Sequence, residues 1–199
     1  MNKGIIYTGK DIKTKDTTTG KLREWDPTRS KVAAGIKKGI IPNIKENDKV
    51  LYLGAAEGYT IAYISDILPK GTVYGIDISP YSMQKLLLAA HRRKNLIPIL
   101  ADCNKVDEYK DLILEKQDFI IQDIAQKNQV EILIKNADLF LKKKGYVLLS
   151  LKLSAISQKN HKKTTEDQLT IFRQKFNIIN QRRLDPFEKK HVLIYGQKK

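Results

Sequence analysis

Residues 50–60 read VLYLGAAEGYT, and this segment decides the fold. Four apolar residues, Val50 to Leu53, precede a stretch with two glycines, two alanines and a glutamate. A short apolar run that ends in such a turn predicts a buried strand leading into a helix. Because glycine permits tight turns, the backbone here can approach a bound group closely. A plain strand–helix turn without a ligand is the alternative.

Strand and helix patterns alternate from this segment to the C-terminus. Such an alternation predicts an α/β protein with a mostly parallel sheet and helices on both faces. The last two strands have no helix between them, so we expect a hairpin with one strand antiparallel to the rest. The expected strands are 49–54, 71–79, 96–102, 117–125, 145–154, 177–185 and 190–199. The expected helices are 30–40, 59–68, 80–94, 107–115, 126–144 and 164–176.

The polar N-terminal segment is expected to form a short strand at 4–9 and a turn at 15–22. The segment REWDPTRS at 23–30 then leads into the first helix, where Asp26 or Thr28 is expected to act as the N-cap.

The chain has one cysteine, Cys103, and three scattered histidines, His91, His161 and His191. This excludes an intrachain disulfide and a CxxC zinc site, and we expect no metal. HRRK at 91–94 is expected to be a solvated helix face. No apolar run reaches the ~18 residues that span a bilayer, and the N-terminus lacks the apolar core of a signal peptide. We therefore expect a soluble, cytoplasmic protein with no membrane contact.

The net charge of +15, with a pI near 9.7, points to a polyanionic partner. Nucleic acid is the first candidate for a surface this positive. A lysine-rich composition that serves only solubility is the alternative. Charge alone does not indicate a reaction.

Acidic residues follow three consecutive expected strands, at Asp77, Asp102 and Asp123. Ligands of open α/β sheets bind at the carboxyl ends of the strands, so these acids are candidate ligand contacts. Three acids would repel a pyrophosphate but suit a cationic sulfonium, which favours S-adenosylmethionine over NAD. The segment also lacks the G-x-G-x-x-G pattern and the Gly-Lys-Ser/Thr ending of a P-loop. The alternative is that these acids cap the helices that follow.

Asp77 could accept hydrogen bonds from both ribose hydroxyls of a nucleoside, and Asp102 could accept one from an adenine amino group. Lys152 lies near the end of a buried-type strand, where a lysine is unfavourable unless it has a function. Close to Asp123, it could orient a hydroxyl and favour its deprotonated form. A solvated strand end is the alternative for Lys152.

Several stretches together resemble one family, the archaeal fibrillarins. They are REWDPTRSKVAAGI, KVLYLGAAEGYT, ISDI, NLIPILAD, DFIIQDIAQ, NADLFLKKKGYVLLSLK and LDPFEKKHVLIYG, in this order from about Leu22 onward. Members of this family are S-adenosylmethionine-dependent RNA 2'-O-methyltransferases of box C/D guide ribonucleoproteins. The resemblance implies a Rossmann-like class I methyltransferase fold with seven strands and an antiparallel C-terminal hairpin. It divides the chain into a short β-type extension at 1–24 and a methyltransferase domain at 25–199.

The resemblance also implies the site residues. Lys31, Asp123 and Lys152 would form the catalytic group, with His191 where related enzymes carry an acid and Glu188 as the alternative fourth member. The cofactor-binding residues would be Gly54, Ala55, Ala56, Tyr59, Thr60, Asp77, Ile78, Asp102, Cys103, Asp123 and Gln126.

Two positions depart from the family pattern. Tyr59 replaces the first of two threonines, and Ile78 replaces an aromatic residue expected against the adenine, so aliphatic packing is expected there. The N-terminal β-rich part is shorter than usual, and if this part supports self-association in relatives, this protein would not dimerise.

The implied partners are a box C/D guide RNA, its target rRNA or tRNA, a NOP-domain scaffold protein and a kink-turn-binding protein. Several alternatives stay open: a stand-alone RNA methyltransferase, a glutamine methyltransferase, and a non-catalytic subunit of an RNA–protein particle. An NAD-dependent enzyme is the least favoured, for want of G-x-G-x-x-G.

Overall fold

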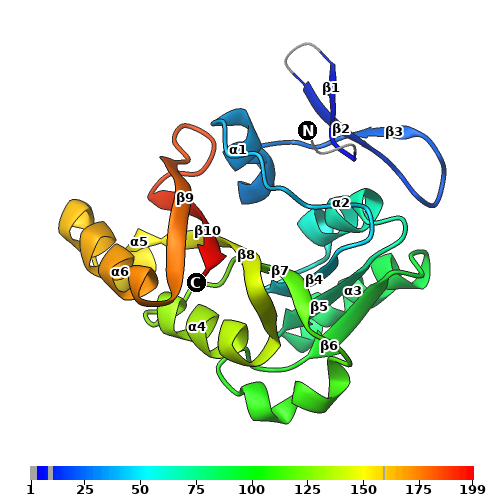
Figure 1. The fold of residues 1–199 in the computed structure, drawn as a ribbon. Helices are drawn as coiled ribbons and strands as arrows, with labels where there is room; N and C mark the ends of the chain where they lie inside the picture. Colours follow the sequence, from blue (N-terminus) through cyan, green and yellow to red (C-terminus); the bar gives the residue numbers. More distant parts are fainter. Residues whose placement is uncertain (1–3, 9–10, 159) are drawn as a thin grey trace.

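A seven-stranded sheet with the order β6-β5-β4-β7-β8-β10-β9 forms the centre of the computed structural model, which describes residues 4–8, 11–158 and 160–199 (Figure 1). Its strands are β4 (Lys49–Leu53), β5 (Thr72–Asp77), β6 (Leu96–Leu100), β7 (Gln117–Gln122), β8 (Leu141–Lys152), β9 (Phe176–Arg183) and β10 (His191–Lys198). β4 pairs in parallel with β5 and β7, and β10 pairs antiparallel with both β8 and β9. The predicted parallel sheet and its antiparallel C-terminal hairpin are confirmed.

Helices cover both faces of this sheet, each over its own apolar core (Figure 1). The helices are α1 (Lys31–Lys37), α2 (Tyr59–Ile67), α3 (Pro80–His91), α4 (Gln129–Phe140), α5 (Leu153–Ile156) and α6 (His161–Lys175). Val50 and Tyr52 of β4 join the core beneath α1, α2 and α3, whereas Leu51 and Leu53 join the core beneath α4 and α6. A central strand buried on both sides explains why its sequence is apolar without alternation.

The starts of two helices differ from the predictions. Ser30, rather than Asp26 or Thr28, caps α1, and its Oγ accepts the backbone N–H of Ala33 at 3.3 Å. The Asp26 carboxylate instead accepts the N–H of Thr28 at 2.8 Å in the preceding turn. Asn160 caps α6, so that helix begins earlier than expected.

The junction of α4 and β8 also differs from the prediction. The chain turns extended at Leu141, which is buried and pairs with Gln117 of β7, so the predicted helix at 126–144 ends at Phe140. Burial and sheet pairing here outweigh the helix-favouring lysines that follow. The helix predicted at 107–115 is two 3-10 turns, η1 (Val106–Glu108) and η2 (Lys110–Leu112).

A small antiparallel sheet precedes α1 and consists of β1 (Ile6–Thr8), β2 (Asp11–Lys15) and β3 (Leu22–Glu24). The expected strand at 4–9 and turn at 15–22 are present, although Gly9 and residues 1–3 lie outside the described residues. Ile12 of β2 and Trp25 are buried in the core beneath α2. The boundary between 1–24 and 25–199 stays a prediction.

Four charged residues form a buried ion cluster between this small sheet, α2 and the turn before β6: Asp16, Arg23, Asp66 and Arg93. The fully buried Asp66 carboxylate accepts Arg23 at 2.6 Å and Arg93 at 3.0 Å, and Arg93 also reaches Asp16 at 3.1 Å. The prediction of a solvated face at 91–94 is therefore wrong for Arg93, whose side chain is only 6% exposed. The cluster attaches the small sheet to the C-terminal end of α2.

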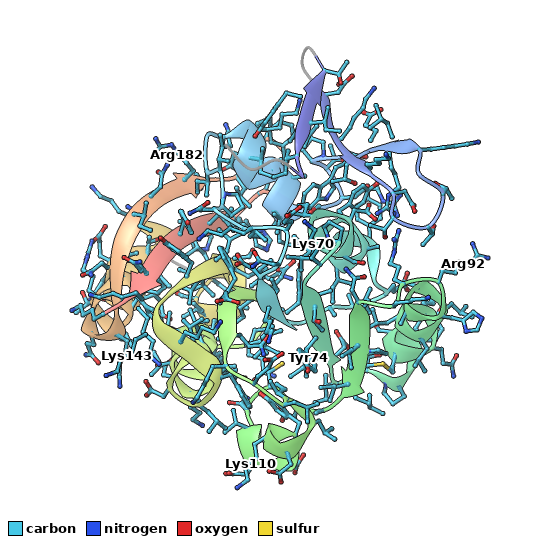
Figure 2. All side chains as sticks on the ribbon, turned by 45° about the vertical axis from the view of Figure 1, so that its right-hand side comes forward. Lys70, Tyr74, Arg92, Lys110, Lys143 and Arg182 are labelled. Atoms are coloured by element: carbon cyan, nitrogen blue, oxygen red, sulfur yellow. The ribbon has the colours of Figure 1, made fainter. Side chains whose placement is uncertain are left out.

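The basic side chains are spread over several faces of the molecule. Figure 2 shows Arg92, Lys110, Lys143 and Arg182 projecting outward on different sides. Across the described ranges, no helix is long and apolar enough to cross a membrane.

Candidate active site

The glycine-bearing loop after β4 lies at the carboxyl edge of the sheet, where the ends of β5, β6 and β7 also lie. Gly54, Ala56 and Gly58 all have positive φ angles, of 81°, 48° and 92°. A Cβ atom on Gly54 would collide with the carbonyl oxygen of Asp123, so only glycine lets the loop pass this close to the end of β7. The predicted close approach is thus made to the segment that carries Asp123.

The N-terminus of α2 opens from this loop without a side-chain cap within the described part of the chain. The first-turn N–H groups of an α-helix have no partner inside the helix, and the helix dipole favours an anion beside them. Thr60, in this first turn, shares a hydrogen bond of 3.1 Å with Ser30. This end of α2 is suited to a carboxylate.

Asp77 and Asp102 hold the neighbouring loops by backbone hydrogen bonds. The two oxygens of Asp77 accept the N–H groups of Ala56 at 2.8 Å and Ser79 at 2.9 Å. Asp102 accepts the N–H of Asn104 at 2.9 Å. A carboxylate has about four acceptor positions, so each acid can still accept hydrogen bonds from a ligand. The capping alternative is wrong for these acids, because Ser79, Lys105 and Asn128 occupy the N-cap positions of the helices that follow.

Cys103 lies in the loop that follows β6, and Gln126 lies in the loop that follows β7. Burial raises the pKa of the Cys103 thiol to about 12, which keeps it a neutral apolar group. Asn104 donates to the Gln126 amide oxygen at 2.8 Å and accepts from Asn128 at 3.0 Å, so side-chain amides join the two loops.

A second charged group, here named the site ion group, consists of Lys31, Asp123, Glu188 and His191. Lys31 Nζ lies 3.1 Å from Asp123 Oδ2 and 3.7 Å from Glu188 Oε1. His191 Nδ1 lies 3.8 Å from Glu188 Oε2 and 2.9 Å from the carbonyl oxygen of Lys189. The structure thus brings α1, the end of β7 and the start of β10 together, with Glu188 between Lys31 and His191.

The environment of this group changes three pKa values. Burial raises the pKa of Asp123, although Lys31 acts in the opposite direction. For Lys31, burial disfavours the charge, but the carboxylates of Asp123 and Glu188 prevail and raise the pKa. Burial lowers the pKa of His191, and the charge of Lys31 acts in the same direction. Lys31 is therefore charged at neutral pH and His191 is neutral.

Lys152 lies directly opposite His191 in the β8–β10 pairing. Residues opposite each other in an antiparallel pair point to the same face of the sheet, with Cβ atoms about 5 Å apart. The Gln129 side chain fixes the Lys152 backbone by accepting its N–H at 2.9 Å and donating to its carbonyl at 3.2 Å. Among the described residues, no carboxylate lies within ion-pair distance of the Lys152 amino group. The partner of Asp123 is Lys31 rather than Lys152.

Tyr59 and Ile78, the two unusual positions, have different surroundings. The Tyr59 ring packs edge-to-face on Tyr63, at 5.2 Å between centroids, and Arg29 lies over it. Ile78 is 60% exposed and follows Asp77, so it offers an apolar surface beside that acid. The structure adds four polar residues that the sequence prediction missed: Arg29, Ser30, Asn104 and Gln129. The only signal for all four in the sequence was that each lies within three positions of a predicted site residue.

Within the described ranges, no group of three or more His, Cys, Asp or Glu side chains is arranged to hold a metal ion. The residues present instead match the functional groups of S-adenosylmethionine. Uncapped helix amides suit its carboxylate, the spare acceptor positions of Asp77 suit its ribose hydroxyls, and Ile78 suits a flat apolar base.

The fold is the one found in solved S-adenosylmethionine-dependent methyltransferases, both in relatives above 30% identity and in more distant proteins. For example, the Methanocaldococcus jannaschii protein TYW2, solved in complex with AdoMet, has a TM-score of 0.58 at 19% sequence identity, covering 96% of this chain and 87% of that one. At this identity the similarity establishes the fold alone.

Within that class, the family model described as Fibrillarin matches residues 1–199, and the chain belongs to the fibrillarin family. The "Fibrillarin-like rRNA/tRNA 2'-O-methyltransferase" of M. jannaschii is 44% identical over 200 residues, covering 96% of this chain and 83% of that protein. A solved fibrillarin/Nop5p complex matches with a TM-score of 0.93 at 36% identity, covering 98% of both chains. Aeropyrum pernix fibrillarin, solved with natively bound S-adenosyl-L-methionine, matches with a TM-score of 0.86 at 33% identity, covering 94% and 88%.

Proposed function

We propose that this chain transfers a methyl group from S-adenosylmethionine to the 2'-oxygen of a ribose in rRNA or tRNA, as the catalytic subunit of a box C/D guide ribonucleoprotein. One observation carries the proposal. Asp123, held by Lys31, lies at the carboxyl edge of the sheet that also carries the glycine-bearing loop, and so does Lys152, which has no carboxylate partner among the described residues. The M. jannaschii relative is named for this reaction, and the A. pernix fibrillarin binds this cofactor.

The cofactor would be held by the loop after β4 and by the ends of β5, β6 and β7. The first-turn N–H groups of α2, with Thr60, would bind its carboxylate, and Asp77 would bind its ribose. Asp102 would accept from its adenine amino group, and Ile78 would pack on the base. When bound, S-adenosylmethionine supplies a methyl group on a positively charged sulfur, which needs no further activation.

The site ion group and Lys152 would act on the ribose hydroxyl. A carboxylate with a raised pKa accepts a proton more readily, so Asp123 would take the hydroxyl proton. Lys152 would donate a hydrogen bond to the oxygen and stabilise the negative charge that develops on it. Lys31 holds the Asp123 carboxylate in place, and Glu188 adds a second carboxylate beside Lys31, with the neutral His191 on the other side of Glu188. Most of the acceleration would come from positioning and electrostatics.

The proposed partners are a guide RNA, its target, a NOP-domain scaffold and a kink-turn-binding protein. A relative forms a complex with Nop5p, and a net charge of +15 suits an enzyme that works beside RNA.

The relatives of this chain come from archaea, which supports a cytoplasmic setting. Residues 1–24 would then be an extension of a methyltransferase domain at 25–199.

Isothermal titration calorimetry of the purified protein with S-adenosylmethionine tests the cofactor site, with NAD as the control. We expect saturable binding of S-adenosylmethionine and none of NAD. If neither ligand bound, even with the scaffold protein present, the chain would be a non-catalytic subunit and the proposal would fail.

A further inference from the structure

Arg29 is an exposed cation beside the candidate active site that has no assigned function. Its guanidinium lies 4.1 Å from the centroid of the Tyr59 ring, which is the geometry of a cation–π contact. Among the described residues, no carboxylate lies within ion-pair distance of it. The nearby Asp26 accepts the N–H and the hydroxyl of Thr28, which lower its pKa, and the charge of Arg29 acts in the same direction from a longer distance.

The aromatic ring beneath Arg29 is held by a stack of other rings. Tyr59 packs against Tyr63, and Tyr63 stacks on the buried Trp25, with 5.0 Å between centroids and 3° between the ring planes. The Tyr63 hydroxyl also donates to the carbonyl oxygen of Glu24 at 2.5 Å. A guanidinium on such a fixed ring loses little further freedom when it binds a ligand.

Arg29 directly precedes two residues that belong to the candidate active site. The next residue, Ser30, is hydrogen-bonded to Thr60, and the one after, Lys31, is ion-paired with Asp123. Two residues span at most about 7 Å, so the backbone of Arg29 lies within that distance of the Lys31 backbone, from which Lys31 extends to Asp123. Because Tyr59 contacts Tyr63 one turn further along α2, Arg29 lies on the flank of that helix rather than over its first-turn amides. This placement favours an RNA contact over a cofactor contact.

We propose that Arg29 binds a backbone phosphate of the RNA substrate next to the methylated nucleotide, and that Tyr59 holds Arg29 for this contact. The inference rests on the proposed function. The planar guanidinium matches the geometry of a phosphate, and phosphate contacts fix the register of a nucleic acid on a protein. The aromatic residue that departs from the family pattern thus has a function on the substrate side.

The test measures methyl transfer at saturating S-adenosylmethionine by a particle assembled from this chain, scaffold, kink-turn protein, guide RNA and target RNA. We expect Arg29→Ala to lower kcat/KM for the target RNA about tenfold, which is the loss of one charge-assisted hydrogen bond. We also expect the slope of log kcat/KM against log salt concentration to become shallower by about one unit. The affinity for S-adenosylmethionine, measured by calorimetry, should not change. Arg92→Ala is the matched control, because Arg92 is an exposed arginine at the C-terminal end of α3.

A second set of variants tests the role of the ring. In a Tyr59→Phe background, where the ring is retained, Arg29→Ala should still lower kcat/KM for the target RNA about tenfold. Tyr59→Leu should by itself lower kcat/KM for the target RNA. The double variant Tyr59→Leu, Arg29→Ala should be no worse than Arg29→Ala by itself, since both changes remove one contact.

Two results would overturn the inference while the proposed function stands. One is an active wild-type particle with unaltered target kinetics in Arg29→Ala. The other is a weaker affinity of Arg29→Ala for S-adenosylmethionine with unchanged target kinetics, which would assign the guanidinium to the cofactor. A wild-type particle that transfers no methyl group would instead overturn the proposed function itself.

Discussion

The two charged groups at opposite ends of α2 differ in how completely their charges are paired. In the buried ion cluster, Asp66 is fully buried and accepts both Arg23 and Arg93 at 3.0 Å or less. In the site ion group, Lys31 is 3.1 Å from Asp123 and 3.7 Å from Glu188, and the neighbouring Lys152 has no carboxylate partner in the described part of the chain. Each carboxylate of the first group thus has an arginine partner within 3.1 Å, whereas the second group leaves a cation available.

This difference distinguishes charged residues that stabilise the fold from charged residues that can act on a substrate. A buried ion pair is expensive to desolvate and is maintained only when its hydrogen bonds are satisfied, as they are around Asp66. A partly exposed group with one unmatched lysine can bind a polar substrate and stabilise a new negative charge. Breaking the first group should therefore affect stability, and breaking the second should affect the reaction.

Arg93→Met should give the largest effect on the free energy of unfolding. The variant leaves Asp66 and Asp16 short of one partner while keeping the apolar part of the side chain. We expect the free energy of unfolding to fall by about 3 kcal/mol, at the lower end of the range for breaking a buried ion pair, since Arg23 remains. Urea unfolding followed by circular dichroism measures this. Arg92→Met, at an exposed neighbour, should stay within about 0.5 kcal/mol of the wild type.

Lys152→Ala should abolish most methyl transfer and leave stability nearly unchanged. We expect the rate of methyl transfer in the assembled particle to be about 100- to 1,000-fold lower. This is the typical loss when one hydrogen-bond donor to a developing oxyanion is removed. Calorimetry should show nearly intact binding of S-adenosylmethionine. Lys143→Ala, an exposed lysine near the other end of β8, is the control. Normal turnover of Lys152→Ala would remove Lys152 from the catalytic group.

Asp77→Ala should weaken the binding of S-adenosylmethionine by about 1–3 kcal/mol, because the ribose hydroxyls of the cofactor would lose a charged hydrogen-bond acceptor. The change also releases the N–H groups of Ala56 and Ser79, which shape the loop. Calorimetry measures the affinity, and Asp111→Ala, at an exposed acid of η2, is the control. An unchanged affinity would place Asp77 outside the cofactor site.

Acid should destabilise the protein through His191, which is the smallest expected effect. Because its pKa is lowered in the folded state, the unfolded chain takes up a proton that the folded chain refuses as the pH falls below about 6.5. The free energy of unfolding should therefore decrease from pH 7 to pH 5, and less so in His191→Gln. Urea unfolding at several pH values measures this, and equal pH dependence in both proteins would contradict it.

The sequence predicted the parts of this molecule that depend on local patterns. Apolar runs identified all seven strands of the large sheet, and acids after three of those strands located the edge that carries the candidate site. Residues 26–30 offered several capping side chains, and only the packed structure selects Ser30 among them. The start of β8 was hidden because its three lysines are also good helix formers.

Contacts between distant residues could not be predicted from patterns. The burial of Arg93 depends on Asp66 and Asp16, which lie 27 and 77 positions earlier. The contact of Lys31 with Glu188 joins α1 to the segment before β10, and no spacing in the chain indicates it. The site roles of the individual residues stay predictions.

Identifying the methylated atom tests the central claim most directly. The assembled particle would be given S-adenosylmethionine and a target RNA, and the RNA would be digested and its nucleosides identified by mass spectrometry. The account predicts one 2'-O-methylated nucleoside at the position that the guide specifies, and none when that nucleotide is 2'-deoxy. A methyl group on a base, or transfer that persists on the 2'-deoxy target, would contradict it.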